Sequence, residues 1–145
     1  MPQPARSHKP EGHKVSDAPV HASRLNPVTA MLVAWLLPGA AHVLLGEARK
    51  GIVFGVVLVG MFLIGIGFGG RLFSFELSDP LVFLAAAAQW GLGLPRLAAA
   101  LLGAGAGNVV APTYEYGNTF LITCGLLNTL IMLDARDVAL GRKRR

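Results

Sequence analysis

Among the ionisable side chains within or beside the long apolar part of this 145-residue chain, three are the first candidates for chemistry. They are His42, Arg96 and Glu115. An ionisable residue surrounded by apolar sequence is a candidate functional residue, because arginine near the centre of a membrane helix costs about 2.5–3.5 kcal/mol on insertion scales. We expect the three to form one polar cluster, either as a structural ion pair or as a site for an anionic lipid headgroup or a small anion.

Other residues with chemical potential are better explained structurally. Asp134 and Asp137 share a helix face and could support acid–base or metal chemistry, but the nearby Arg136 and Arg142 favour a solvated group of salt bridges. GAGAGN at 103–108 resembles a phosphate-binding loop without its third glycine, which favours a flexible turn.

The remaining histidines and the cysteine predict no metal site and no disulfide. The spacing of His8, His13 and His21 matches no helical or zinc-finger pattern, and Cys124 has no second thiol. No recognisable catalytic motif is present. The sequence therefore favours a non-enzymatic protein, and it indicates no catalytic residue, cofactor or metal.

Composition indicates where these residues lie. The chain is 53% hydrophobic and 14% charged, against roughly 25% charged in an average soluble domain. A bilayer core requires about 20 apolar residues in a helix. We therefore predict an all-α membrane protein, an antiparallel bundle of four transmembrane helices with a disordered basic N-terminal tail at 1–25 and a basic end at 141–145. The predicted spans are about 27–45, 51–69, 80–102 and 118–140.

Basic residues set the predicted orientation. Four spans place both termini on one side, and the lysines and arginines of the two ends make that side the cytoplasmic one. The linker carrying Arg49 and Lys50 then faces outward. An alternative breaks the third span at Pro95, so that 81–111 forms a re-entrant pair.

The stretch PGAAHVLLGEARKG at 38–51 allows three interpretations. It could be a signal-peptide cleavage site near residues 39–41, a functional site at His42, or a tight corner between two helices. The corner accounts for all the unusual residues, since glycine permits close approach and left-handed backbone and His42 can hydrogen-bond across it. The predicted corner residues are Pro38, Gly39, His42, Gly46 and Gly51.

This stretch also carries a resemblance. The pattern PGAAH, with glycines at 46 and 51, is similar to the first hairpin of the TM-two (two-transmembrane-helix) domain, although Val43 and Leu44 replace the expected aromatic pair. The chain more closely resembles a family of uncharacterised four-span bacterial membrane proteins, through PGAAHVLLG, YEYGNTFL and GLLNTLIMLDARDVALGRK. The resemblance implies a multi-pass protein of the bacterial inner membrane and no particular activity.

The predicted function is a small scaffold or accessory subunit that binds lipid or a partner membrane protein. Its expected partners are the bilayer, anionic lipid headgroups, and a membrane protein or a second copy of the chain, with no nucleic acid. The alternative is a component of a small transporter or channel that uses Arg96. The absence of a visible inverted repeat argues against this alternative, and a membrane enzyme ranks third.

Overall fold

The computed structural model describes residues 25–142, and the regular elements in that range are α-helices. The predicted disordered tail, apart from its last residue, and the histidines at 8, 13 and 21 lie outside the described residues, as do residues 143–145. The helices are α1 (Pro27–Leu36), α2 (Ala40–Leu44), α3 (Ala48–Gly67), α4 (Pro80–Trp90), α5 (Leu94–Leu101) and α6 (Tyr114–Ala139).

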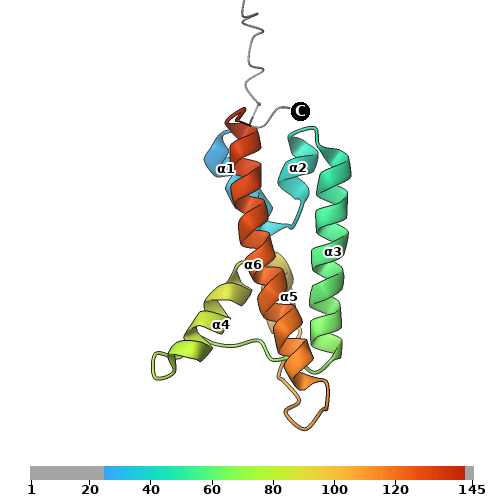
Figure 1. Cartoon of the computed structure of the whole chain (residues 1–145), viewed down its shortest axis with the longest axis vertical. Helices are drawn as coiled ribbons and strands as arrows, with labels where there is room; N and C mark the ends of the chain where they lie inside the picture. The colour runs from blue at the N-terminus through green and yellow to red at the C-terminus, as the bar shows by residue number, and fades with distance from the viewer. Residues whose placement is uncertain (1–24, 143–145) are drawn as a thin grey trace, which may run out of the picture.

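Two long helices, α3 and α6, form the axis of the molecule (Figure 1). They contain 20 and 26 residues, which correspond to about 30 and 39 Å at 1.5 Å per residue. Leu58 and Phe62 of α3 pack with Leu121 and Cys124 of α6 in a common core. Both helices are long and apolar enough to cross a membrane, and α4 with α5 would add a third candidate if that bent pair is one span. The fold is therefore all-helical with two to three candidate spans, whereas the sequence predicted four.

The segment predicted as the first span is broken into two short helices. α1 ends at Leu36 and α2 begins at Ala40. Pro38 between them has no backbone N–H, and Gly39 has a left-handed φ of 81°. The 10-residue α1 is about 15 Å long, half of a bilayer core.

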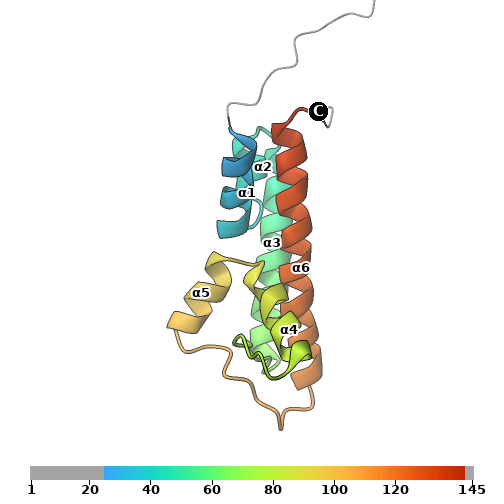
Figure 2. The ribbon, with the colours of Figure 1, turned by 90° about the vertical axis from the view of Figure 1, so that its left-hand side faces the viewer.

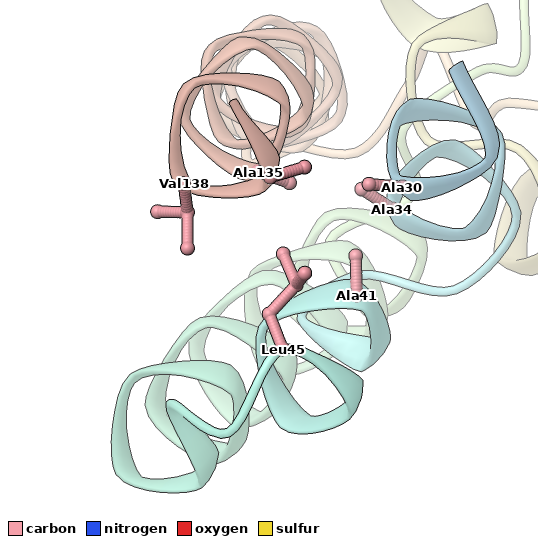
Figure 3. Packing of buried hydrophobic residues seen from close by; sticks show 7 residues of the cluster. Ala30, Ala34, Ala41, Leu45, Ala135 and Val138 are labelled. Atoms are coloured by element: carbon pink, nitrogen blue, oxygen red, sulfur yellow. The ribbon is translucent and has the colours of Figure 1, made fainter. Parts of the chain in front are cut away.

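α1 and α2 fold back on each other, and we call this pair the first hairpin. Leu45, after α2, packs in the cluster that contains Ala135 and Val138 near the end of α6 (Figure 3). Leu25, before α1, packs against the same cluster. A continuous helix over 27–45 would hold its ends about 28 Å apart. The predicted single span is therefore corrected to a hairpin whose two ends lie at the same end of the molecule.

The segment predicted as the third span is also bent, and we call α4 and α5 the second hairpin. The two helices meet at an angle of 109° (Figure 2). The break lies at residues 91–93, where Gly93 has a left-handed φ of 57°. Pro95 is in the first turn of α5, where a missing N–H breaks no helical hydrogen bond. The bend that the sequence analysis considered as an alternative is therefore present, two to four residues before the proline.

The two halves of the chain repeat one pattern of two short helices followed by a long one. Each half begins with a side-chain cap and a proline: Asn26 accepts from the N–H of Val28, and Asp79 accepts from that of Leu81. The first hairpin lies beside the C-terminal half of α6 and the second beside its N-terminal half (Figures 1 and 2). The hairpins thus approach each other from opposite ends, although no repeat between the two halves was visible in the sequence.

The tips of the two hairpins meet midway along α6. The indole N–H of Trp35 donates to the carbonyl of Trp90 at 2.8 Å. The side-chain amide of Asn128 in α6 donates to the carbonyls of Ala34 and Gly91, at 3.1 and 2.8 Å. The two bonds from Asn128 satisfy carbonyl groups that the helix breaks leave without helical partners, whereas the carbonyl of Trp90 also accepts from the N–H of Gly93 at 3.2 Å. We call this contact the hairpin junction, formed by Ala34, Trp35, Trp90, Gly91, Gly93 and Asn128.

Candidate functional site

His42 pairs with an acidic residue that the sequence analysis had assigned to a solvated cluster. Its Nε2 lies 2.9 Å from an Oδ atom of Asp134 in α6. His42 is fully buried, and the Asp134 side chain is 21% exposed. The His42 ring also meets the ring of Phe54 edge-on, with centroids 5.2 Å apart. The pair therefore joins the first hairpin to α6, and Phe54 of α3 covers it.

Asp134 borders an apolar groove between α3 and α6 with a volume of about 490 Å³. The groove walls are the side chains of Val53, Phe54, Val57, Leu58, Leu127, Leu130 and Ile131. Two further grooves, of about 420 and 550 Å³, lie on α3 beside the second and the first hairpin and have no charged lining residue. The His42–Asp134 pair is thus the polar feature at the edge of an otherwise apolar groove.

Arg96, in the first turn of α5, is buried by local contacts. Only 7% of the residue is exposed. Its guanidinium donates to the carbonyl of Phe73 and lies 4.4 Å from the ring centroid of Trp90. The carbonyl acceptor and the cation–π contact both offset part of the cost of burying the guanidinium. The position supports a structural role, in which Arg96 fastens the linker after α3 to the second hairpin.

The structure does not bring the three predicted cluster residues together. Glu115 is exposed in the first turn of α6, 19 residues and about 28 Å of helix before Asp134. Within residues 25–142, the ion pairs are His42–Asp134, Glu47–Lys50 and Asp137–Arg142, so Glu115 does not pair with Arg96. The prediction placed all three at one end because it treated 27–45 as a complete crossing.

The predicted corner residues belong to the first hairpin and its contact with α3. Gly39 is packed so closely that a Cβ atom there would collide with the carbonyl oxygen of Gly51. Gly51 is buried in α3, and a Cβ on it would lie 2.6 Å from a methyl of Val43. Gly46, with φ 87°, ends the hairpin before α3. Pro38 precedes Gly39 at the tip, where the chain turns inside the molecule.

Buried amides complete the polar interior. Gln89 donates to the carbonyl of Arg71 and accepts from the N–H of Phe73, both at 2.9 Å. Asn118, which lies within the first two turns of α6, accepts from the N–H of Arg71 at 2.8 Å. These two side chains fasten the linker after α3. Periodicity could not identify their role, because their partners are backbone groups 16 to 47 residues away.

Within residues 25–142, no three potential ligands among histidine, cysteine, aspartate and glutamate lie close enough together to hold a metal ion. Cys124 is buried, and its thiol donates to the carbonyl of Leu121 in the same helix. The GAGAGN segment is a loop whose residues 105, 107 and 108 contact the linker after α3. Cys124 and the GAGAGN loop therefore both have structural contacts within the chain.

Comparison with known proteins supports the expectation of an uncharacterised family. A family model described as a family of unknown function (DUF6677) matches residues 29–144. The match covers both hairpins, both long helices and the hairpin junction. No curated protein and no solved structure matches the chain. The chain therefore belongs to the DUF6677 family of unknown function.

Proposed function

We propose that the chain is an integral membrane protein with two full spans, α3 and α6, and two re-entrant hairpins that enter the bilayer from opposite sides. The lengths of α3 and α6 and the exposed apolar side chains of α3, such as Val56 at 68% and Leu63 at 63%, support this placement. Each hairpin places non-helical backbone, at the break between its two helices, at the depth of the bilayer core. That is tolerated where protein covers it, as at the hairpin junction.

The proposed orientation keeps both termini on the cytoplasmic side of a bacterial inner membrane. With two spans, Arg49 and Lys50 move to the side of the termini. Of the 13 lysines and arginines, Arg71 and Arg96 then lie toward the opposite side. The others precede Leu25, lie in the first turn of α3 or follow Ala135. The difference in the number of lysines and arginines between the two sides is larger than in a four-span arrangement. The positive-inside rule assigns the more basic side to the cytoplasm.

We propose that the biochemical role is that of a scaffold or accessory subunit that binds lipid or a partner membrane protein. The observation that carries this proposal is how the polar and apolar groups are distributed. Gln89, Arg96, Asn118 and Asn128 hold backbone groups of the same chain, whereas the three grooves are open and almost wholly apolar. The basic residues at one end would attract anionic lipid headgroups.

Native mass spectrometry of the protein extracted in lipid nanodiscs tests this role. We expect the intact chain to retain at least one lipid, or a partner or second copy in fixed stoichiometry. The double variant Arg49→Gln/Lys50→Gln should reduce anionic lipid retention, because it removes two basic residues of the proposed cytoplasmic face. As a matched control, Arg71→Gln removes a charge from the opposite end. A bare monomer from native membranes would reject the proposal.

A transporter or channel component is the second candidate, and the repeated half-helix pattern favours it. Inverted repeats with broken helices that meet near the bilayer midplane are common in secondary transporters. However, the Arg96 guanidinium already donates to the carbonyl of Phe73 and lies over the ring of Trp90. Ion or solute flux into proteoliposomes that is abolished by Arg96→Gln and restored by Arg96→Lys would favour transport over the scaffold role.

A further inference from the structure

Arg96 carries a permanent positive charge that the contacts of its own chain balance only in part. Arginine has five N–H donors and stays protonated in proteins. Its Nη2 donates to the carbonyl of Phe73, whereas the buried Nε has no acceptor. Within residues 25–142, Nη1 has no acceptor either and, unlike Nε, is not fully buried. No carboxylate in that range forms an ion pair with Arg96, so one terminal nitrogen of the guanidinium is accessible to a further acceptor.

The position of Arg96 in α5 increases the need for a negative group. Arg96 lies in the first turn of the helix, and no side chain caps that end. The positive end of a helix dipole favours anions and disfavours a cation. The carbonyl of Phe73 and the ring of Trp90 carry no net charge, so they do not neutralise the guanidinium. An anion at Nη1 would complete the site.

We propose that Arg96 binds a carboxylate on a transmembrane helix of a different membrane protein. This inference rests on the proposed membrane placement and specifies the partner in the proposed accessory role. The partner helix lies against the second hairpin and carries one aspartate or glutamate on an otherwise apolar face. Arg96 is the only charged residue between Pro80 and Leu101, and the exposed side chains of the same two helices are apolar, such as Leu84 at 62% and Leu97 at 45%.

The depth of the guanidinium favours a helix over a lipid headgroup. The guanidinium lies 4.4 Å from the ring centroid of Trp90, a residue of the hairpin junction midway along α6. Its Cα is three residues beyond Gly93 of the same junction, about 4.5 Å along α5. A bilayer core is about 30 Å thick, so headgroup phosphates lie about 15 Å or more from its midplane. A carboxylate on a transmembrane helix can instead lie at the depth of Arg96.

A second copy of the chain offers no such carboxylate in the described range. The acidic residues between 25 and 142 lie in linkers, at helix ends or in the last two turns of α6: Glu47, Glu76, Asp79, Glu115, Asp134 and Asp137. None of them lies midway along a helix. Charge complementarity at the depth of Arg96 therefore points to another protein.

Association with a designed transmembrane peptide tests the proposal on the full chain in vesicles of zwitterionic lipid. The probe is a polyleucine helix with one glutamate at its centre, and the control peptide has glutamine at that position. Fluorescence energy transfer between labelled protein and labelled peptide measures binding. We expect roughly tenfold tighter binding of the glutamate peptide, because close charge pairs at interfaces are strongly coupled. Equal binding of the two peptides would overturn the proposal.

Substitution of Arg96 shows whether this residue carries the preference for the glutamate peptide. Arg96→Gln should remove the preference, because glutamine can still donate to the carbonyl of Phe73 but has no charge. Arg96→Lys should keep part of it. Arg71→Gln is the matched control, since the exposed Arg71 guanidinium lies over the ring of Phe73, 5.9 Å from its centroid, and its loss should leave the preference intact. A preference that persists in Arg96→Gln would reject Arg96 as the binding residue.

A carboxylate supplied within the chain tests the same site without changing Arg96. Ala100 is exposed and lies four residues after Arg96 in α5, where the side chain of a glutamate can reach the guanidinium. Ala100→Glu should therefore compete with the peptide and cancel the preference, whereas the uncharged control Ala100→Gln should retain it. This pair decides the test if Arg96→Gln does not fold. A preference of wild-type size in Ala100→Glu would contradict the proposed site.

Native mass spectrometry separates this inference from the proposed function. A chain that retains lipid or a partner from its own membrane but binds the two peptides equally would reject the carboxylate partner only. A bare monomer with equal peptide binding would reject the proposed function as well. Lipid retention that is lost in Arg96→Gln, without a peptide preference in the unaltered chain, would assign a lipid phosphate to Arg96 and overturn the proposal.

Discussion

His42 illustrates how a residue that is prominent in the sequence acquires its partner only through folding. Asp134 lies 92 residues away, and no periodic pattern connects the two. The general expectation that an ionisable group at membrane depth needs a partner was sound. It could not select Asp134 over Glu115, because that choice depends on which end of α6 the first hairpin contacts.

At the residue scale, a double-mutant cycle tests the contact between His42 and Asp134. His42→Leu or Asp134→Leu removes the contact between the two side chains, which should lower the free energy of unfolding by about 1–3 kcal/mol. The double variant His42→Leu/Asp134→Leu should lose less stability than the sum of the two single variants, because the contact between the two side chains is lost only once. The measurement is the free energy of unfolding of purified protein in mixed detergent micelles.

Asp137→Leu is the control for this cycle. Asp137 pairs with Arg142 at 3.7 Å, and both side chains are more than one-third exposed, so its loss should cost no more than about 1 kcal/mol. Additive effects of the two single variants of the buried pair would show that His42 and Asp134 are not energetically coupled.

At the scale of elements, glycine positions decide where helices break and how closely the hairpins approach. Gly93 has φ 57°, and a Cβ on it would collide with the carbonyl oxygen of Trp35 at the hairpin junction. The sequence predicted such a role for Gly39 and Gly46. The sequence did not predict this role for Gly93, because Pro95, two residues later, is the more conspicuous helix breaker.

Gly93→Ala should therefore destabilise the protein by about 2 kcal/mol or more, from backbone strain together with a displaced junction. Gly60→Ala is the matched control, since Gly60 lies within α3 and a Cβ there meets no atom within 4 Å. Alanine is favoured over glycine inside a helix by about 1 kcal/mol, so this control should be neutral or stabilising. Equal melting temperatures for the two variants would contradict the assigned role of Gly93.

At the scale of the whole molecule, the fold-back of the first hairpin reverses the expected side of two loops. Single cysteines introduced by Arg49→Cys, Leu77→Cys, Val110→Cys and Leu140→Cys, in a Cys124→Ala background, can be labelled with a membrane-impermeant maleimide. With two spans, residue 49 should react from the same side as residue 140, and residue 77 from the opposite side.

A four-span bundle predicts the reverse for both positions, so either one decides between the two arrangements. Residue 110 serves as the control, because both arrangements place it opposite residue 140. Labelling of residue 49 from the side of residue 110 would reject the two-span topology. The readout is the mass shift of the labelled chain with intact vesicles compared with permeabilised ones.

The sequence alone determined the class of the protein, because class depends on composition and local pattern. Its apolar content, the lengths of its apolar runs and the concentration of basic residues at its ends indicate a helical membrane protein, and its motifs indicate an uncharacterised family. Pro38 and Gly39 also marked a break in the chain, since their backbone preferences act locally.

Only the tertiary structure decided what happens at each break. A hydropathy window sums side chains over about 20 residues and carries no information about chain direction, so a straight span and a hairpin give the same apolar run. The return of the first hairpin depends on small residues such as Ala34, Ala41 and Ala135, which allow it to pack against α6. The partners of His42, Arg96 and Asn128 depend on the same packing, since each lies on an element distant in sequence.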